Sequence, residues 1–135
     1  MADKVFSCKK IVAGCTTASI LISKDDICFY LTDPQKGMII EKGHALYGTD
    51  ISNKILIFPG GKGSSSVQLD GLYQLMLNGK CPCGMIVEYA DTILVTCAIL
   101  MKIPLVNNLP DAFYMKIKNG KQCKLDADNK RVILL

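Results

Sequence analysis

A turn rich in glycine and serine holds the residues of this sequence whose types and spacing could do chemistry. The apolar segment 55–58 runs into a turn at 60–63 that contains Lys62 among glycines, and serines fill positions 64–66. Glycine adopts positive φ angles and lets a ligand approach the main chain closely. If a helix begins at the serines, its first amide groups carry about half a positive charge. The turn is therefore predicted to form a cradle for one small anion, such as a carboxylate or a phosphate.

The turn offers several groups that could bind this anion. We expect it to contact Gly61, Lys62, Gly63 and Ser65, with Lys62 adding a mobile positive charge at the rim. A purely structural role, in which Ser65 or Ser66 only caps the helix, agrees equally well with the spacing. Two known phosphate-binding patterns do not fit. Lys62 is followed by Gly63, unlike in the Walker loop, and Ser66 stands where the dinucleotide fingerprint has its last glycine.

A serine at the start of the helix could also act as a base or a nucleophile. Its hydroxyl is too weak an acid to ionise unaided, but the helix end and Lys62 would stabilise the alkoxide. The only histidine, His44, lies in a separate polar loop at 43–52 and is expected at the surface. A hydrolase with a Ser–His–Asp triad is therefore disfavoured.

Length and composition limit the classes of protein that fit. The chain of 135 residues is half apolar, which predicts one globular domain over 1–135. The net charge is +4, but the lysines are scattered and tryptophan is absent, so no nucleic-acid surface is expected. The apolar segment 93–101 is too short to cross a bilayer, so no membrane association is expected. The mild positive charge suits a small anionic molecule or an acidic protein partner.

The cysteines indicate a reducing compartment. There are seven of them at irregular spacing, and the first residues, Met-Ala-Asp-Lys, do not resemble a signal peptide. We therefore expect a cytoplasmic protein whose thiols are unpaired and mostly buried. Cys81 and Cys83 lack the usual spacing and the second Cys/His pair of a metal site, so no metal is expected. A redox or metal role for this pair is kept as an alternative.

The pattern of apolar residues predicts the elements that must position the turn. The predicted strands are 5–12, 18–22, 27–31, 38–40, 55–58, 85–87 and 103–106, followed by a hairpin of 122–125 and 132–135. The apolar residues of a helix over 67–78 are spaced as one buried face: Leu69, Leu72, Tyr73 and Met76. A second helix, from 91 or 92 to 101, is apolar on all sides and is expected to be buried. This order indicates an α/β fold with a partly parallel sheet, a β-rich flank and a C-terminal hairpin.

Several segments taken together resemble one known family. The segment Lys-Ile-Leu-Ile-Phe-Pro-Gly-Gly-Lys-Gly-Ser-Ser at 54–65 resembles the core motif of the aconitase X small-subunit, or swivelling-domain, family. Further matches are the Asp-Pro turn at 33–37, His-Ala-Leu-Tyr-Gly at 44–48, the helix end at 72–79 and the segment 98–106. The resemblance covers most of residues 10–135.

This resemblance implies a fold, a partner and a reaction. Members of the family have a swivelling β/β/α domain similar to that of aconitase and are the small subunits of two-chain hydro-lyases. The large subunit carries an iron–sulfur cluster, so this chain is expected to bind no cofactor itself and to show little activity alone. By its place in the motif, Ser64 would be the proton acceptor. The reaction of the archaeal members is dehydration of (R)-5-phosphomevalonate to trans-anhydromevalonate 5-phosphate.

Two other functions fit the same residues. Relatives within the family dehydrate cis-3-hydroxy-L-proline, and this chain could be the small subunit of such an enzyme. It could also be a non-catalytic anion-binding or assembly domain of such a complex, because the segment 66–70 departs from the family pattern just after the first serines.

Overall fold

Four parallel strands form the centre of the fold. The computed structural model describes residues 4–135. The parallel strands, in their spatial order, are β3 (Cys15–Ile22), β6 (Ile55–Phe58), β7 (Gly84–Val87) and β8 (Leu105–Asn107). Parallel neighbours need crossover connections. Helix α1 (Ser65–Leu77) connects β6 to β7 and helix α2 (Thr92–Met101) connects β7 to β8, whereas the segment 23–54 connects β3 to β6 without a helix. The serine turn therefore lies where β6 ends and α1 begins.

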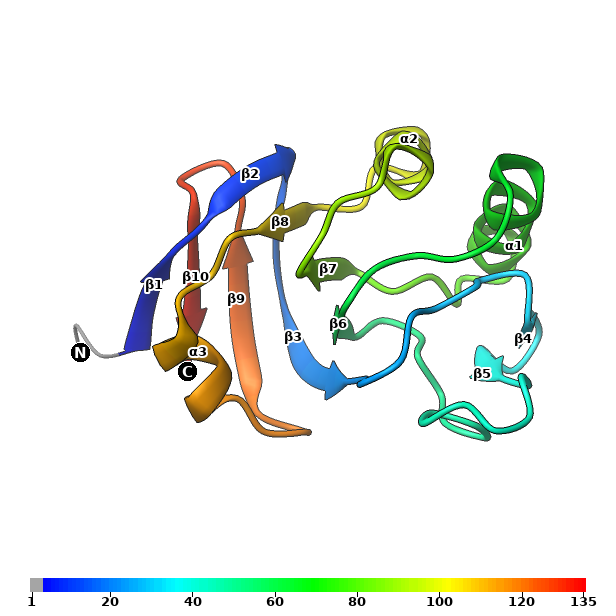
Figure 1. Ribbon diagram of the computed structural model, residues 1–135, viewed down its shortest axis with the longest axis horizontal. Helices are drawn as coiled ribbons and strands as arrows, with labels where there is room; N and C mark the ends of the chain where they lie inside the picture. The colour runs from blue at the N-terminus through cyan, green and yellow to red at the C-terminus, as the bar shows by residue number, and fades with distance from the viewer. Residues whose placement is uncertain (1–3) are drawn as a thin grey trace.

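Antiparallel strands extend this sheet at both edges. Beyond β3 come β9 (Gln122–Asp126), β10 (Arg131–Leu134) and β1 (Val5–Ser7), and beyond β8 comes β2 (Lys9–Val12). Strands β1 and β2 stand at opposite edges of the eight-stranded sheet, yet only Cys8 separates them in the chain. The sheet must therefore curve until its two edges meet, as Figure 1 shows. The predicted single strand 5–12 is wrong in this respect, since it is two strands with different partners.

Alternate residues of β6 contribute to two separate cores. Leu56 and Phe58 belong to the core beneath α1 and α2, which lie side by side over one face of the parallel strands (Figure 1). Ile55 and Ile57 belong to the core that also contains residues of β9, β10 and the short helix α3 (Asp111–Lys116). This alternation follows from the period of two in a strand. Every residue of β6 is buried, which confirms the prediction of a central strand at 55–58.

The segment 27–31 is not a strand, contrary to the prediction. It forms only a single bridge, between Ile27 and Gly61, before the chain turns. The buried side chain of Gln68 forms hydrogen bonds with the backbone of this segment, in place of a neighbouring strand. Its Oε1 accepts from Phe29 N–H at 2.7 Å, and its Nε2 donates to Ile27 O at 3.0 Å. The next segment forms a small separate sheet of β4 (Thr32–Asp33) and β5 (Met38–Ile39).

The buried faces of both main helices were predicted only in part: Leu72 is buried and Leu69 packs against the core as predicted, but other positions differ. Helix α1 starts at Ser65, and its buried residues are Gln68, Gly71, Leu72 and Leu75. Tyr73 and Met76, predicted to face the core, are exposed. Helix α2 is not buried on all sides, because Ile99 and Leu100 are exposed as well. Within residues 4–135, every helix falls short of the length and apolar content needed to span a membrane.

The remaining elements mostly follow the sequence pattern. The partly parallel sheet and the C-terminal hairpin of β9 and β10 are confirmed. Helix α3 was not predicted, because its six residues are too few to show a helical period.

Gly71 brings α1 into close contact with the backbone of Phe29 and Tyr30. A Cβ at this position would lie 2.3 Å from the carbonyl carbon of Phe29 and 2.3 Å from Tyr30 N. Gly71→Ala should therefore lower the free energy of unfolding by about 2 kcal/mol or more, although alanine normally favours a helix. Urea denaturation measures this change. The matched exposed substitution Gln74→Ala should have an effect within about 0.5 kcal/mol, and equal stability of both variants would contradict the close contact.

Candidate active site at the start of helix α1

Ser64 is the N-cap of α1. Its backbone is extended, with φ −73° and ψ 166°, and its Oγ accepts a hydrogen bond from Val67 N–H at 3.4 Å. This distance is longer than the usual range of about 2.7–3.2 Å for N–H···O bonds, so the helix holds the oxygen only loosely. The residue is exposed, and its hydroxyl can turn toward an incoming molecule. The helix cap is therefore Ser64. The purely structural interpretation of the turn had expected Ser65 or Ser66 in this position.

The two residues after Ser64 have free amide groups. Among residues 4–135, no acceptor is found for Ser65 N–H or Ser66 N–H, and both residues are exposed. The first turn of α1 contains no acidic residue that would compensate the positive helix end. Ser66 Oγ lies 3.5 Å from Ser64 Oγ, so both hydroxyls border the same exposed helix end. Amide donors, hydroxyls and a partial positive charge together are what an anion cradle requires.

Gly63 and Gly61 have different structural reasons to be glycine. Gly63 has φ +105°, and a Cβ there would lie 3.2 Å from Cys28 Sγ. The positive φ turns the chain into the helix start. Gly61 donates its N–H to Asp91 Oδ2 at 3.2 Å, and a Cβ on it would come within 2.7 Å of Gln68 Nε2. The Gly61 amide is thus engaged in holding the turn.

Asp91 connects the turn to the start of α2. As the N-cap of α2, it accepts a hydrogen bond from Leu94 N–H on Oδ1 at 2.8 Å, while its Oδ2 accepts from Gly61. From the other side, Gln68 ties α1 to the segment 27–29. The sequence indicated position 91 only as a possible start of the second helix. Gln68 was missed, because nothing in the pattern distinguishes a buried glutamine from an exposed one.

Lys62 forms an ion pair with Glu41, although the sequence suggested a mobile charge. Its Nζ lies 2.6 Å from Glu41 Oε2, and its amide donates to Ile27 O at 3.2 Å. The hydrogen bond to Glu41 raises the pKa of Lys62, which is therefore positively charged at neutral pH. Both side chains are partly exposed, so an arriving anion can compete with Glu41 for the lysine. No sequence motif pointed to Glu41, which follows β5.

His44 is buried, contrary to the expectation of a surface residue. Its Nδ1 accepts from Leu46 N–H at 2.9 Å and its Nε2 faces Asp26 O at 2.8 Å, so the proton is assigned to Nε2. With both ring nitrogens bound to the backbone, His44 supports its loop and is not placed to act as a base. Tyr89 borders the serine turn instead: its ring lies against Gly60 and its hydroxyl donates to Asp26 Oδ1 at 2.7 Å.

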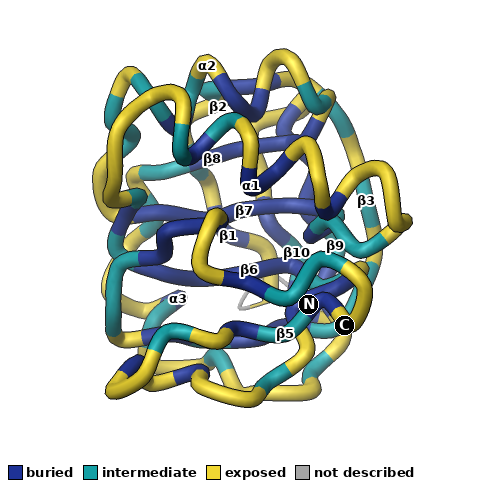
Figure 2. The backbone as a smooth tube through the Cα atoms, turned by 90° about the vertical axis from the view of Figure 1, so that its right-hand side faces the viewer, coloured by how far each residue is buried: buried dark blue, intermediate teal, exposed yellow. Residues whose placement is uncertain are grey.

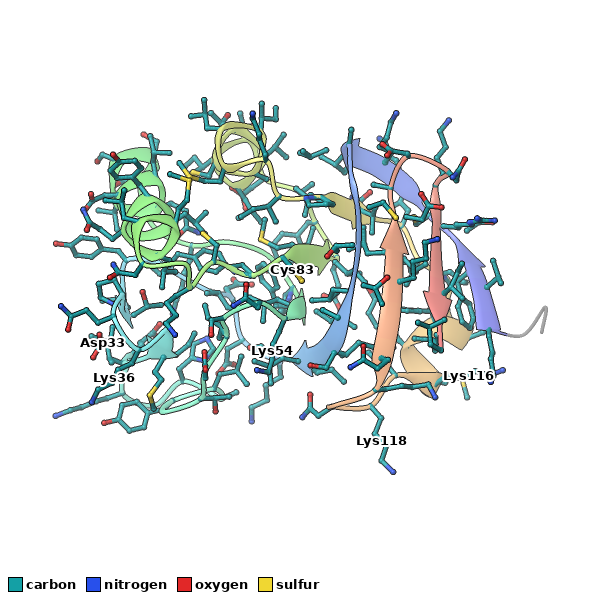
Figure 3. The ribbon with its side chains drawn as sticks, turned by 180° about the vertical axis from the view of Figure 1, so that it is seen from behind. Asp33, Lys36, Lys54, Cys83, Lys116 and Lys118 are labelled. Atoms are coloured by element: carbon teal, nitrogen blue, oxygen red, sulfur yellow. The ribbon has the colours of Figure 1, made fainter. Side chains whose placement is uncertain are left out.

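The cysteine pair lies away from the serine turn. Cys81 Sγ donates to Leu72 O at 3.3 Å, and burial raises the pKa of this thiol to about 11, so it stays protonated at neutral pH. Cys83 lies beside Lys54 where β6 and β7 begin (Figure 3), at the opposite end of the strands from Ser64. Over the described range 4–135, no group of three or more His, Cys, Asp or Glu residues could hold a metal ion.

Comparison with known proteins finds relatives over nearly the whole chain. A family described as the aconitase X swivel domain matches residues 5–134. The phosphomevalonate dehydratase small subunit of Methanocella arvoryzae is 44% identical over 119 residues, which make up 87% of this chain and 89% of that protein. The protein of the same name from Methanothrix thermoacetophila is 35% identical over 128 residues, or 94% and 92% of the two chains.

A solved structure agrees with these relatives. The crystal structure of Thermococcus kodakaraensis aconitase X in its holo-form contains a chain with 34% sequence identity and a TM-score of 0.86. The match covers 97% of the present chain and 98% of that chain. The expected fold, a swivelling α/β domain with a partly parallel sheet, is confirmed by this agreement.

The two hydrogen bonds of Asp91 can be separated by substitution. Asparagine is as good an N-cap as aspartate, so Asp91→Asn should keep the bond from Leu94 N–H but present an amide to Gly61 N–H. Hydrogen exchange of the Gly61 amide should then accelerate about fivefold or more, the effect of a bond worth about 1 kcal/mol, with Leu94 still protected. Asp91→Ala should accelerate both amides. NMR exchange rates test this, and an unchanged Gly61 rate in both variants would exclude the connection.

Proposed function

The chain belongs to the aconitase X swivel-domain family, and from this we propose that it is the small subunit of a two-chain phosphomevalonate dehydratase. The reaction is the removal of water from (R)-5-phosphomevalonate to give trans-anhydromevalonate 5-phosphate. We infer the substrate from the two archaeal relatives, which are named phosphomevalonate dehydratase small subunits. The chain covers nearly the full length of both. Its partner is the large subunit that the name small subunit implies.

The observation that carries the proposal is the position of Ser64. The residue stands exposed at the N-cap of a thirteen-residue helix, within the segment that aligns with the family. Ser64 is exposed, and it does not line the neighbouring cavity that includes Ser66. An active site on an open surface must be covered by another surface to exclude water from the reaction. A large subunit that closes over Ser64 would provide that cover.

We assign to Ser64 the removal of a proton from the substrate carbon next to the carboxylate. The alkoxide form would be stabilised by Val67 N–H, which already points at the oxygen from 3.4 Å, and by the positive end of α1. Ser66 Oγ, at 3.5 Å, can turn its proton toward the same oxygen. The Val67 amide and the helix end are in place before substrate arrives, so only the two hydroxyls need to turn.

The anionic groups of the substrate would meet the other residues of the turn. The free amides of Ser65 and Ser66 are donors for a phosphate or carboxylate oxygen. Lys62 would exchange Glu41 for a substrate oxygen, which leaves its charge paired before and after binding. Gly61 and Gly63 would contribute by shape: they set the path of the turn and leave room for the ligand beside the main chain.

The cofactor belongs on the partner in this proposal. Residues 4–135 offer no group of three or more potential metal ligands, so they do not fit an iron–sulfur cluster, and we assign the cluster to the large subunit. The chain alone should accordingly have almost no activity. All seven cysteines are free, which suits a reducing compartment, and we place the enzyme in the cytoplasm.

Substitution of Ser64 separates its chemical role from its role as a helix cap. Asparagine caps a helix as well as serine does but lacks the hydroxyl. In the reconstituted two-subunit enzyme, Ser64→Asn and Ser64→Ala should both lower kcat about 100-fold or more, with subunit association unchanged. Only Ser64→Ala should also lose about 1 kcal/mol of stability. Steady-state dehydration and thermal unfolding measure these effects. Near-normal turnover by Ser64→Asn would show that Ser64 is a cap and nothing more.

Lys62 and Glu41 can be tested as a matched pair. If Lys62 binds the substrate, Lys62→Met should raise KM about tenfold or more, because a hydrogen bond to a charged group is worth about 1.5–3 kcal/mol. Glu41→Gln removes the competing carboxylate and should leave KM equal or lower. If Lys62 serves only to hold the loop through Glu41, both variants should raise KM alike, and this outcome would remove Lys62 from the substrate site.

A further inference from the structure

An apolar groove runs between α1 and α2. Its volume is about 530 Å³, and its lining consists of Ser66, Leu69, Asp70, Tyr73, Met76, Leu100 and Met101. Asp70 is the only charged residue among them. Tyr73 and Met76 are 44% and 41% exposed, and Leu100 on α2 is 57% exposed. Contiguous exposed apolar side chains of this kind are typical of surfaces that bind another protein.

The sequence pattern of both helices supports a covered surface here. The residues spaced as a buried face in α1 include Leu69, Tyr73 and Met76, and these line the groove. Helix α2 has no charged residue from Thr92 to Met101, yet Ile99 and Leu100 are more than half exposed. Figure 2 shows exposed positions along the outward side of both helices. Both helices thus expose apolar side chains that do not pack into the core of this chain.

The groove is continuous with the serine turn. Ser66 lines the groove at one end, and its hydroxyl lies 3.5 Å from that of Ser64. Any protein that closes over Ser64 must therefore lie at the mouth of the groove. This continuity identifies the occupant, because the same partner that completes the active site can extend over the two helices.

We propose that the groove between α1 and α2 is a docking surface for the large subunit. This inference rests on the proposed function, since it takes the large subunit as the partner. The segment that docks is apolar, to match Tyr73, Met76 and Leu100, and it carries a positive group near Asp70. Docking places the partner over the N-terminus of α1, so that the interface and the active site form together.

The test measures association of the separately purified subunits by calorimetric titration. Leu100→Lys and Tyr73→Ala should each weaken association about 30-fold or more, the loss typical of a central interface residue. Both side chains are exposed, and unchanged thermal unfolding of the isolated variants would establish that the fold is intact. The control is Met115→Lys on α3, because Met115 is an equally apolar side chain that is 85% exposed outside the groove. Its Kd should stay within about twofold of the unsubstituted chain.

Activity distinguishes this docking role from a catalytic role. Leu100→Lys should reduce the rate at low concentrations of large subunit and recover normal kcat at saturation, whereas Ser64→Ala should not recover. Unchanged affinity in both groove variants would overturn the docking surface while leaving the proposed function intact. Failure of the unsubstituted subunits to associate at all would instead contradict the proposed function. A dimer of the isolated chain that Leu100→Lys dissociates would assign the groove to a second copy, and would also overturn this inference.

Discussion

The fixed position of the first turn of α1 is the constraint on which the rest of the site depends. A helix end can attract an anion or polarise a hydroxyl only if it is held still. Two side chains hold this one. Gln68, 1% exposed, binds the backbone of Ile27 and Phe29, and Asp91 binds the amide of Gly61. Because Asp91 also caps α2, hydrogen bonds connect the two helices and the turn into one unit.

This unit of two helices and a turn has an exposed end and an apolar side, and both indicate a partner. The exposed end presents Ser64 and the free amides of Ser65 and Ser66 to solvent, where water would weaken every electrostatic interaction. The apolar side is the groove between the helices, which the chain leaves open. A single large subunit would cover both, so that the site becomes dry when the complex forms. An isolated small subunit would then hold its catalytic groups in place but show almost no activity.

The fold could be predicted from sequence where one local pattern decides the outcome. The continuous apolar run at 55–58 indicated a central strand, and the segments 122–125 and 132–135 indicated the C-terminal hairpin. Both are found. The prediction of a strand at 27–31 was wrong, because a long-range contact with the Gln68 side chain, and not a neighbouring strand, pairs the backbone of Ile27 and Phe29. The helix faces were predicted only in part: Leu72 is buried, whereas Tyr73 and Met76 are exposed. An apolar pattern alone does not tell which apolar side chains of a helix reach the protein's own core.

The candidate site was predictable to a similar degree. The glycines and serines of the turn could be recognised from their spacing, but Glu41 and Gln68 could not, since neither lies in a motif. The prediction that His44 is exposed was wrong. It rested on the polar loop around His44, but two hydrogen bonds to the backbone satisfy the ring and allow it to be buried. In the proposed reaction, Ser64 takes the proton from the substrate. A structure of the two-subunit enzyme with bound substrate would locate this side chain beside the reacting carbon. We expect Ser64 Oγ at about 3–3.5 Å from the carbon that loses the proton; a different side chain in that position, with Ser64 turned away from the substrate, would contradict the account.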